Sequence, residues 1–217
     1  MKISEKIKKF VNNPNKIIFS AYFSALITFL FAIYNIFLGL YYADSWSISF
    51  SIYYLCLTCA RVIVILIERK VNAYPQDFAV SIRKKACIGL SIFMFFIDLC
   101  LFAPITLMLL RPKAAAFGMI PAIVIATYTT YKIIAAIINY NKAKKGEKLT
   151  YKLLRALSIV DALVSVLSLQ HILIMVNGGM TFEMLVLSAV SSFIILLIIL
   201  IFSVTQIVYV TKKYKRF

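Results

Sequence analysis

Residues 154–176 read LRALSIVDALVSVLSLQHILIMV, an apolar stretch of 23 residues interrupted at regular intervals by polar ones. A helix of about 20 mostly apolar residues, rising about 1.5 Å per residue, crosses the hydrocarbon core of a bilayer. The polar residues are spaced by three or four, which places them on one face of such a helix. Because that face would avoid lipid, the stretch predicts a membrane helix that packs inside a bundle. The polar residues are Arg155, Ser158, Asp161, Ser165, Ser168 and His171.

Five further stretches share this length and apolar character, and the six together occupy most of the 217-residue chain. In total 63% of the residues are hydrophobic and 15% are charged, a composition far from that of a soluble globular domain. The stretches are too long and too evenly apolar for the strands of a membrane barrel. We therefore expect an all-α, polytopic bundle of six transmembrane helices. The other five cover residues 17–40, 47–67, 86–110, 114–140 and 184–210.

Basic residues gather in alternate breaks between these stretches. Twenty of the 24 Lys and Arg residues lie in the N-terminal segment, in the breaks after the second and fourth stretches, and in the tail. The opposite breaks hold only Arg111 and Lys113, and the stretches hold Arg61, Lys132 and, at the start of the fifth, Arg155, which is counted here with the break before it. By the positive-inside rule, both termini are expected to be cytoplasmic, in a multi-pass protein of the cytoplasmic membrane. The expected domains are a basic amphipathic N-terminus (1–16), a transmembrane domain (17–210) and a basic tail (211–217).

The net charge of +16 predicts a membrane surface as the partner, not a nucleic acid. The basic residues sit in short runs beside the membrane, where each attracts anionic headgroups by about 1 kcal/mol. Residues 193–202 are apolar all round and have no preferred face, so the sixth helix is expected at the periphery. There it could contact a second copy of the chain or another membrane subunit.

Polar residues inside the apolar stretches are the candidate functional residues, because they are costly in lipid unless they face protein or water. Arg61, Lys132 and Asp161 lie at similar depths and could meet in one layer. Asp98 lies nearer the midplane, and its expected partner is one of these two long basic side chains or a tyrosine hydroxyl. The first, second, fourth and fifth helices are expected to share a polar interior. The candidates for a substrate or ion path are Arg61, Asp98, Tyr128, Tyr131, Lys132, Asp161, Gln170 and His171.

Two further patterns concern the helices themselves. Pro104 and Pro121 are expected to break the third and fourth helices in their outer halves. A shift of 71 residues sets Arg61 over Lys132, and a shift of 67 residues overlays identical residues of the third and fifth helices. The sequence therefore leaves open an internal repeat of two-helix hairpins, and many transporters contain internal repeats.

Catalytic, metal and cofactor motifs are weak or absent in the sequence, so we expect no cofactor and no metal site. Cys56 and Cys59 form a C-x-x-C, but they lie inside a predicted span, where cysteine is an ordinary small apolar residue. Asp98 and Asp161 lack the flanking residues and the equal depth of an intramembrane aspartyl protease dyad. For His171, a structural hydrogen bond is the default interpretation and proton handling the alternative.

The segments YKIIAAIINYNK (131–142) and ALVSVLSLQHILI (162–174) resemble an uncharacterised family of small, six-span bacterial integral membrane proteins. Those proteins are at most loosely called permease-like. The resemblance covers mainly the second to fifth helices, and it implies the same fold without an activity. It does not extend to Asp98 or Asp161.

Three functions stay open from the sequence. The first is permease-like transport of a small polar or anionic solute, or of protons, through the polar interior. The second is an accessory or assembly subunit whose buried charges only specify helix packing. The third is a membrane thiol oxidoreductase that uses Cys56 and Cys59. Asp98 is a carboxylate predicted to lie alone near the middle of the membrane. Its position favours transport over the other two functions by a narrow margin.

Overall fold

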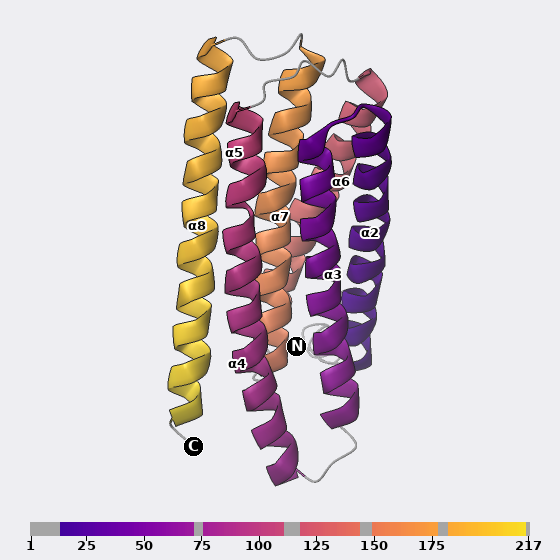
Figure 1. Ribbon diagram of the computed structural model, residues 1–217. Helices are drawn as coiled ribbons and strands as arrows, with labels where there is room; N and C mark the ends of the chain where they lie inside the picture. Colours follow the sequence, from indigo (N-terminus) through magenta and orange to yellow (C-terminus); the bar gives the residue numbers. More distant parts are fainter. Residues whose placement is uncertain (1–13, 72–75, 111–117, 144–148, 178–181, 216–217) are drawn as a thin grey trace, which may run out of the picture.

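The chain folds into a bundle of long helices. The computed structural model describes residues 14–71, 76–110, 118–143, 149–177 and 182–215. These residues are almost entirely helical and contain no strand, because lipid requires each backbone group to be bonded within its own segment. The helices are α2 (Pro14–Tyr41), α3 (Ser45–Val71), α4 (Gln76–Cys100), α5 (Phe102–Leu110), α6 (Met119–Ala143), α7 (Leu149–Val176) and α8 (Phe182–Lys215). They stand side by side, with α8 at one edge and α2 and α6 at the other (Figure 1).

Six segments are long and apolar enough to cross a membrane, as predicted, and the protein is a multi-pass membrane protein. Together α4 and α5 make the third span, which breaks at Leu101. The break has a local cause, because the ring of Pro104 would clash with the carbonyl of Cys100 four residues earlier. The expected break at Pro121 is wrong, since Pro121 lies in the first turn of α6, where a missing amide donor costs nothing.

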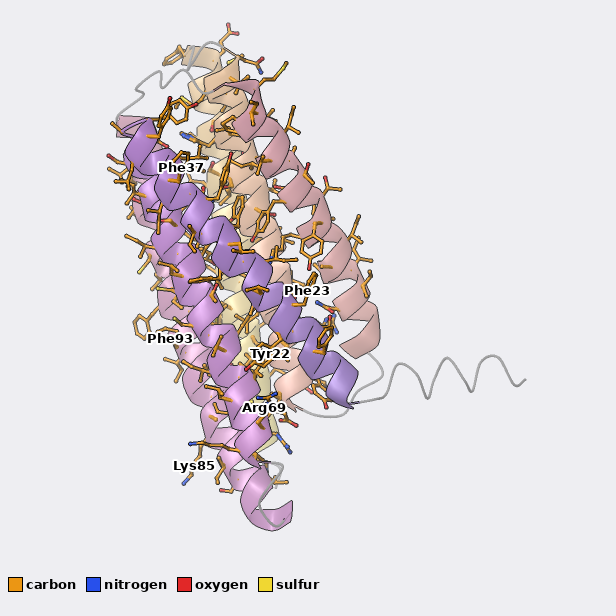
Figure 2. All side chains as sticks on the ribbon, turned by 90° about the vertical axis from the view of Figure 1, so that its right-hand side faces the viewer. Tyr22, Phe23, Phe37, Arg69, Lys85 and Phe93 are labelled. Carbon is orange, nitrogen blue, oxygen red and sulfur yellow. The ribbon has the colours of Figure 1, made fainter. Side chains whose placement is uncertain are left out.

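Successive spans run in opposite directions, so their ends gather at two ends of the bundle (Figure 1). The basic end is where α3 ends and α4 begins, and the far end is where α2 ends and α3 begins. Figure 2 shows Arg69 and Lys85 at the basic end and Phe37 toward the far end. The predicted amphipathic N-terminus and the 111–113 turn lie almost wholly outside the described residues, and 211–215 of the predicted tail continue α8.

The α2–α3 hairpin at the far end depends on local geometry. Gly39 lies against α3 so closely that a Cβ atom would collide with the Ile48 side chain and approach its backbone nitrogen to 3.0 Å. Ala43 takes a left-handed φ of 50° to reverse the chain. Asp44 then caps α3, because its carboxylate accepts hydrogen bonds from the Ser47 amide at 3.0 Å and the Ser47 hydroxyl at 2.6 Å.

The polar face predicted for α7 points into the bundle, and α3 also has a buried polar face. On α7, the predicted polar residues from Ser158 to His171 are all buried, while Leu173 on the opposite face is 45% exposed. On α3, Tyr54, Thr58, Arg61 and Glu68 are buried on one face. Both helices therefore turn these polar residues toward protein, together with buried apolar residues such as Leu57 and Leu157, and expose apolar side chains such as Leu173 to lipid on this part of the surface.

At the periphery, α8 differs from the expectation in one respect. It lies at the edge of the bundle, as predicted, and only 24% of its span is buried. It nevertheless has a preferred face, because Ser192, Leu196, Ile199 and Ser203 recur at helical spacing and are buried. Small serines on this face let α8 approach α4 and α7 closely. The interpretation of 193–202 as a run without a face is therefore wrong.

Candidate functional site

Polar side chains from four helices meet in the interior and form the central cluster. Arg61 and Lys132 are each 2% exposed and Asp161 is 0% exposed. At about 1.5 Å per residue, each of the three lies at least about 15 Å from either end of its helix. The prediction that they meet in one layer is confirmed. The central cluster consists of Ser24 and Thr28 of α2, Arg61 of α3, Tyr128 and Lys132 of α6, and Asp161 of α7.

One carboxylate oxygen, Asp161 Oδ2, carries both ion pairs. Arg61 Nη2 donates to it at 2.7 Å and Lys132 Nζ at 2.6 Å. The other oxygen, Oδ1, accepts a hydrogen bond from the Tyr128 hydroxyl at 3.3 Å. The short N–O distances are typical of charge-assisted hydrogen bonds. Asp161 therefore joins α3, α6 and α7 near the middle of the bundle.

Thr28 connects α2 to the same group. Its hydroxyl accepts hydrogen bonds from Lys132 Nζ at 2.5 Å and from Arg61 Nη1 at 3.0 Å. It donates its own proton to the Ser24 carbonyl at 2.8 Å. A hydroxyl has one proton and two lone pairs, so Thr28 can accept from both cations while its proton is directed to the Ser24 carbonyl or, at 3.3 Å, to Asp161 Oδ2.

The two cations are held very differently. Arg61 also donates to the Ser24 hydroxyl at 2.7 Å, to the Ser24 carbonyl at 3.3 Å and to the Leu157 carbonyl at 3.3 Å. Its planar guanidinium thus has partners on α2 and α7 in fixed directions. Lys132 has two hydrogen-bond partners among the described residues, Thr28 and Asp161, and its ammonium, at the end of a flexible four-carbon chain, also lies 5.1 Å from the Tyr128 ring centroid. Arg61 is therefore the fixed cation, and Lys132 is the one that can exchange partners with little rearrangement.

With both cations protonated, the central cluster carries one positive charge in excess. Among the described residues, Asp161 is the one carboxylate in ion-pair contact with Arg61 or Lys132. An unbalanced charge in the membrane interior is costly, by at least about 2.5 kcal/mol. The arrangement therefore favours binding an anion or losing a proton.

An apolar groove of about 610 Å³ lies directly outside the central cluster, between α2 and α6. Figure 2 shows the face of the bundle that these two helices form. Phe31 and Tyr128 line the groove, and their rings stack with centroids 3.5 Å apart. Since the Tyr128 hydroxyl reaches Asp161 behind them, this stacked pair separates the buried charges from the groove.

A row of buried polar residues extends from the central cluster toward the far end, and we call this row the polar column. On α7 it continues from Asp161 through Ser165 and Ser168, both 0% exposed. The Tyr54 hydroxyl on α3 lies beside Ser168, yet neither oxygen meets hydrogen-bond geometry with any described residue. The Oδ1 atom of Asn35 on α2 likewise has no hydrogen-bond partner among the described residues. Buried polar atoms of this kind are ordinarily satisfied by water.

The polar column ends at a group formed by Asp44, Trp46 and His171. The rings of Trp46 and His171 stack with centroids 3.7 Å apart. Asp44 Oδ2 lies 3.7 Å from His171 Nε2. Burial alone would raise the pKa of the Asp44 carboxyl, but His171 and Ser47 outweigh it and hold that pKa below its usual value. His171 therefore lies at the far end and not in the central cluster.

Asp98 forms a second, separate site on the other side of α7. It is 0% exposed, and its Oδ1 accepts a hydrogen bond from the Tyr53 hydroxyl at 3.1 Å. Of the expected partners it has the tyrosine and neither Arg61 nor Lys132. Its Oδ2 has no hydrogen-bond partner among the described residues.

Two other candidates lie apart from the central cluster. Gln170 binds α8, where its amide donates to the hydroxyls of Ser191 at 2.5 Å and Ser188 at 3.1 Å. Tyr131 is half-buried at the edge of the α2–α6 groove, 5.9 Å from Lys132 Nζ to its ring centroid. Gln170 therefore serves packing, while Tyr131 borders the central cluster.

The cysteine pair lies on the lipid-facing surface. Cys59 is exposed and lines an apolar groove between α2 and α3, and Cys56 is half-buried. Both are free thiols. No group of three or more potential metal ligands occurs among the described residues.

Tyr53 and Ser203, which contact Asp98, are not among the site residues predicted from the sequence. Tyr53 is hidden by its neighbour Tyr54, because adjacent residues of a helix point about 100° apart and these two serve different sites. Ser203 directly follows the apolar run of α8. The sequence does not show that Ser203 is buried, because its burial depends on the packing of α8 against α4.

No family model, curated protein or solved structure matches this chain. The resemblance of 131–142 and 162–174 to permease-like bacterial proteins therefore stays a prediction.

Replacing Asp161 with Asn should strongly destabilise the fold. The change leaves Arg61 and Lys132 buried without a counter-charge, which typically costs about 3–5 kcal/mol. Unfolding in mixed detergent micelles measures this loss. The double variant Asp161→Asn with Lys132→Met should recover part of it. Asp98→Asn is the matched control and should unfold like the wild type. Equal stability of the two Asn variants would contradict the central role of Asp161.

The fluorescence of Trp46, the one tryptophan of the chain, should report on His171, the one histidine. The imidazole stacked on the indole, with centroids 3.7 Å apart, should quench its emission. His171→Gln should therefore raise the emission of Trp46 at constant pH. An unchanged emission in His171→Gln would contradict the stacking of the two rings.

Proposed function

We propose that the protein is a membrane transporter that binds a small anion between Arg61 and Lys132. The observation that supports this most is the excess positive charge of the central cluster, where two buried cations share one carboxylate. An anion bound beside Asp161 would give two positive and two negative charges. Removing the unbalanced charge from the membrane interior would then contribute favourably to the free energy of anion binding.

Lys132 is the residue that would move. Its two bonds, to Thr28 and Asp161, can be exchanged for one to an incoming anion while Arg61 keeps Asp161 paired. The ligand is small, because the central cluster is closed on the groove side by the stacked Phe31 and Tyr128 rings. Chloride, nitrate, a short carboxylate or phosphate has this chemistry.

The polar column supports a route to the far end. Its unpartnered oxygens on Asn35, Tyr54 and Ser168 would hold water or the passing solute. At the basic end the path would be blocked by a partly buried salt bridge, in which Arg83 donates to both oxygens of Glu68 at 3.0 and 3.1 Å. Thr150 of α7 donates to the same carboxylate at 2.9 Å. This arrangement suits alternating access, with the barrier at the basic end formed by contacts among α3, α4 and α7.

An accessory or assembly subunit is the second candidate. It is favoured by the complete pairing of both Asp161 oxygens, which would equally serve to fix the packing of α2, α3, α6 and α7. In that case the charged residues need no ligand. Purification in a fixed ratio with a second membrane protein, and no response to anions, would favour this candidate.

Lys132→Met should abolish anion binding and keep the fold, because it removes the excess charge and leaves the Arg61–Asp161 pair intact. Thermal unfolding of the purified protein with chloride, nitrate, acetate or phosphate measures binding. An anion at about 100 times its dissociation constant stabilises the wild type by about 2.7 kcal/mol. Flux of the stabilising anion into proteoliposomes should likewise be lost.

Lys212→Met is the matched control, since Lys212 is exposed at the basic end. It should retain both the stabilisation and the flux. Absence of stabilisation by every anion in the wild type, or the same response in Lys132→Met, would contradict the proposal.

We extend the proposal to orientation, with the basic end facing the cytoplasm by the positive-inside rule. Single cysteines at Ser45 and Lys85, both exposed, would test it in a chain whose four native cysteines are replaced. A membrane-impermeant thiol reagent should label Ser45→Cys on intact cells and Lys85→Cys only after permeabilisation. The reverse pattern would invert the topology.

A further inference from the structure

Asp98 is a buried carboxylate that the anion site does not use. It lies on α4, three residues before the break at Leu101, with α3, α7 and α8 around it. Tyr53 donates to Oδ1, and Oδ2 has no hydrogen-bond partner among the described residues. The hydroxyls that face it, those of Tyr53 and Ser203, are neutral, and an ionised carboxylate with neutral donors alone is unfavourable in a membrane interior. Asp98 therefore needs a positive partner that the described residues do not supply.

A small cavity of about 10 Å³ adjoins Asp98. This is about the size of one water molecule. Its polar lining comes from Ser91 of α4 and from Ser203 and Gln206 of α8. Ser91 and Gln206 both lie toward the basic end from Asp98, since α4 begins there and α8 ends there. The cavity thus leads from the carboxylate toward the basic end.

Among the residues that the structure describes, no cation faces Asp98. Tyr53 is the titratable group that faces it from α3. The α7 residues at the cavity are apolar, namely Leu153, Ala156, Leu157 and Val160. The other lining residues are Met94 of α4 and Phe202 of α8. Among the described residues around the cavity, none therefore offers a balancing charge.

We propose that Asp98 is a proton-binding site, which takes up a proton on Oδ2 and releases it to the adjacent cavity. In the protonated state the new O–H donates to Ser203 or Gln206, so the unpartnered oxygen becomes a satisfied donor. Release transfers the proton to a water molecule in the cavity and leaves the carboxylate held by Tyr53. No other reactant is needed.

A proton suits this site better than a metal cation. Metal cations that bind oxygen take about six or more ligands. Here the polar lining supplies Asp98, Ser203, Gln206 and Ser91, and the Ser91 hydroxyl already donates to the Cys87 carbonyl at 2.8 Å. A cavity of water size leaves no room for a hydration shell.

The proton would travel with the anion, a statement that rests on the proposed function. A proton and a monovalent anion that move together carry no net charge across the membrane. Asp98 also has a physical connection to the central cluster. Tyr53, which holds Asp98, adjoins Tyr54, whose ring packs edge-on against Tyr128 with centroids 6.0 Å apart, and Tyr128 donates to Asp161. The aromatic residues between the two carboxylates can therefore transmit a change at either one.

Infrared spectroscopy of the purified protein in lipid tests the proton site without any transport assay. At neutral pH the wild type should show the carbonyl stretch of a protonated carboxylic acid, and the band should disappear on alkaline titration. Asp98→Asn should lose this band. Glu183→Gln should keep it, as a matched control, because Glu183 is exposed at the start of α8. Absence of the band in the wild type, or its survival in Asp98→Asn, would overturn the proposal.

Two further measurements separate the possible failures. Stabilisation by sodium over potassium that is lost in Asp98→Asn would overturn the proton assignment in favour of a metal cation. In proteoliposomes, an imposed gradient of the stabilising anion should acidify the lumen with the wild type and not with Asp98→Asn. If the wild type binds anions but moves no protons with them, the coupling is wrong. If anions have no effect while the Asp98 band is present, the anion proposal fails and the proton site stands.

Discussion

The structure depends on one carboxylate that two cations share in the middle of a membrane bundle. Asp161 binds Arg61 and Lys132 through the same oxygen, and Thr28 and Tyr128 complete the group. These contacts come from α2, α3, α6 and α7, so a single buried network fixes the positions of four helices. Lipid provides no hydrophobic driving force between helices, and such polar contacts, with close packing, hold them together. The remaining spans surround this group: α4 and α5 pack beside α3, and α8 closes the edge.

The same constraint separates two kinds of buried charge. With every group ionised, Asp161 would have two cations for one carboxylate, and Asp98 would be a carboxylate without a cation among the described residues. The two sites lie on different sides of α7, and the Tyr53, Tyr54 and Tyr128 side chains lie between them. A bound anion would balance the charge at the first site, and a bound proton would balance the charge at the second. A purely structural network would be expected to balance its charges at each site, since unbalanced charge in lipid opposes folding.

The sequence predicts the architecture well because lipid limits the solutions. Six apolar stretches, the polar face of α7 and the meeting of Arg61, Lys132 and Asp161 follow from helical periodicity and depth alone. Periodicity cannot say which neighbour a face meets. For this reason the sequence did not show that His171 stacks on Trp46 at the far end of the polar column, or that Gln170 binds α8. It also missed Tyr53, whose role depends on how α3 and α4 are rotated against each other. Proline positions were similarly ambiguous. Pro121 is harmless because it lies in the first turn of α6, whereas Pro104 lies inside the third span and breaks the helix there.

The central claim is that the excess positive charge of the central cluster takes up an anion. An experimental density map of the protein in lipid, with bromide or iodide added and located by its anomalous signal, tests this most directly. We expect an anion within hydrogen-bond distance of Lys132 Nζ, with Arg61 still bound to Asp161. A map at saturating halide that shows no anion there, and Lys132 still bound to Thr28 and Asp161, would contradict the account.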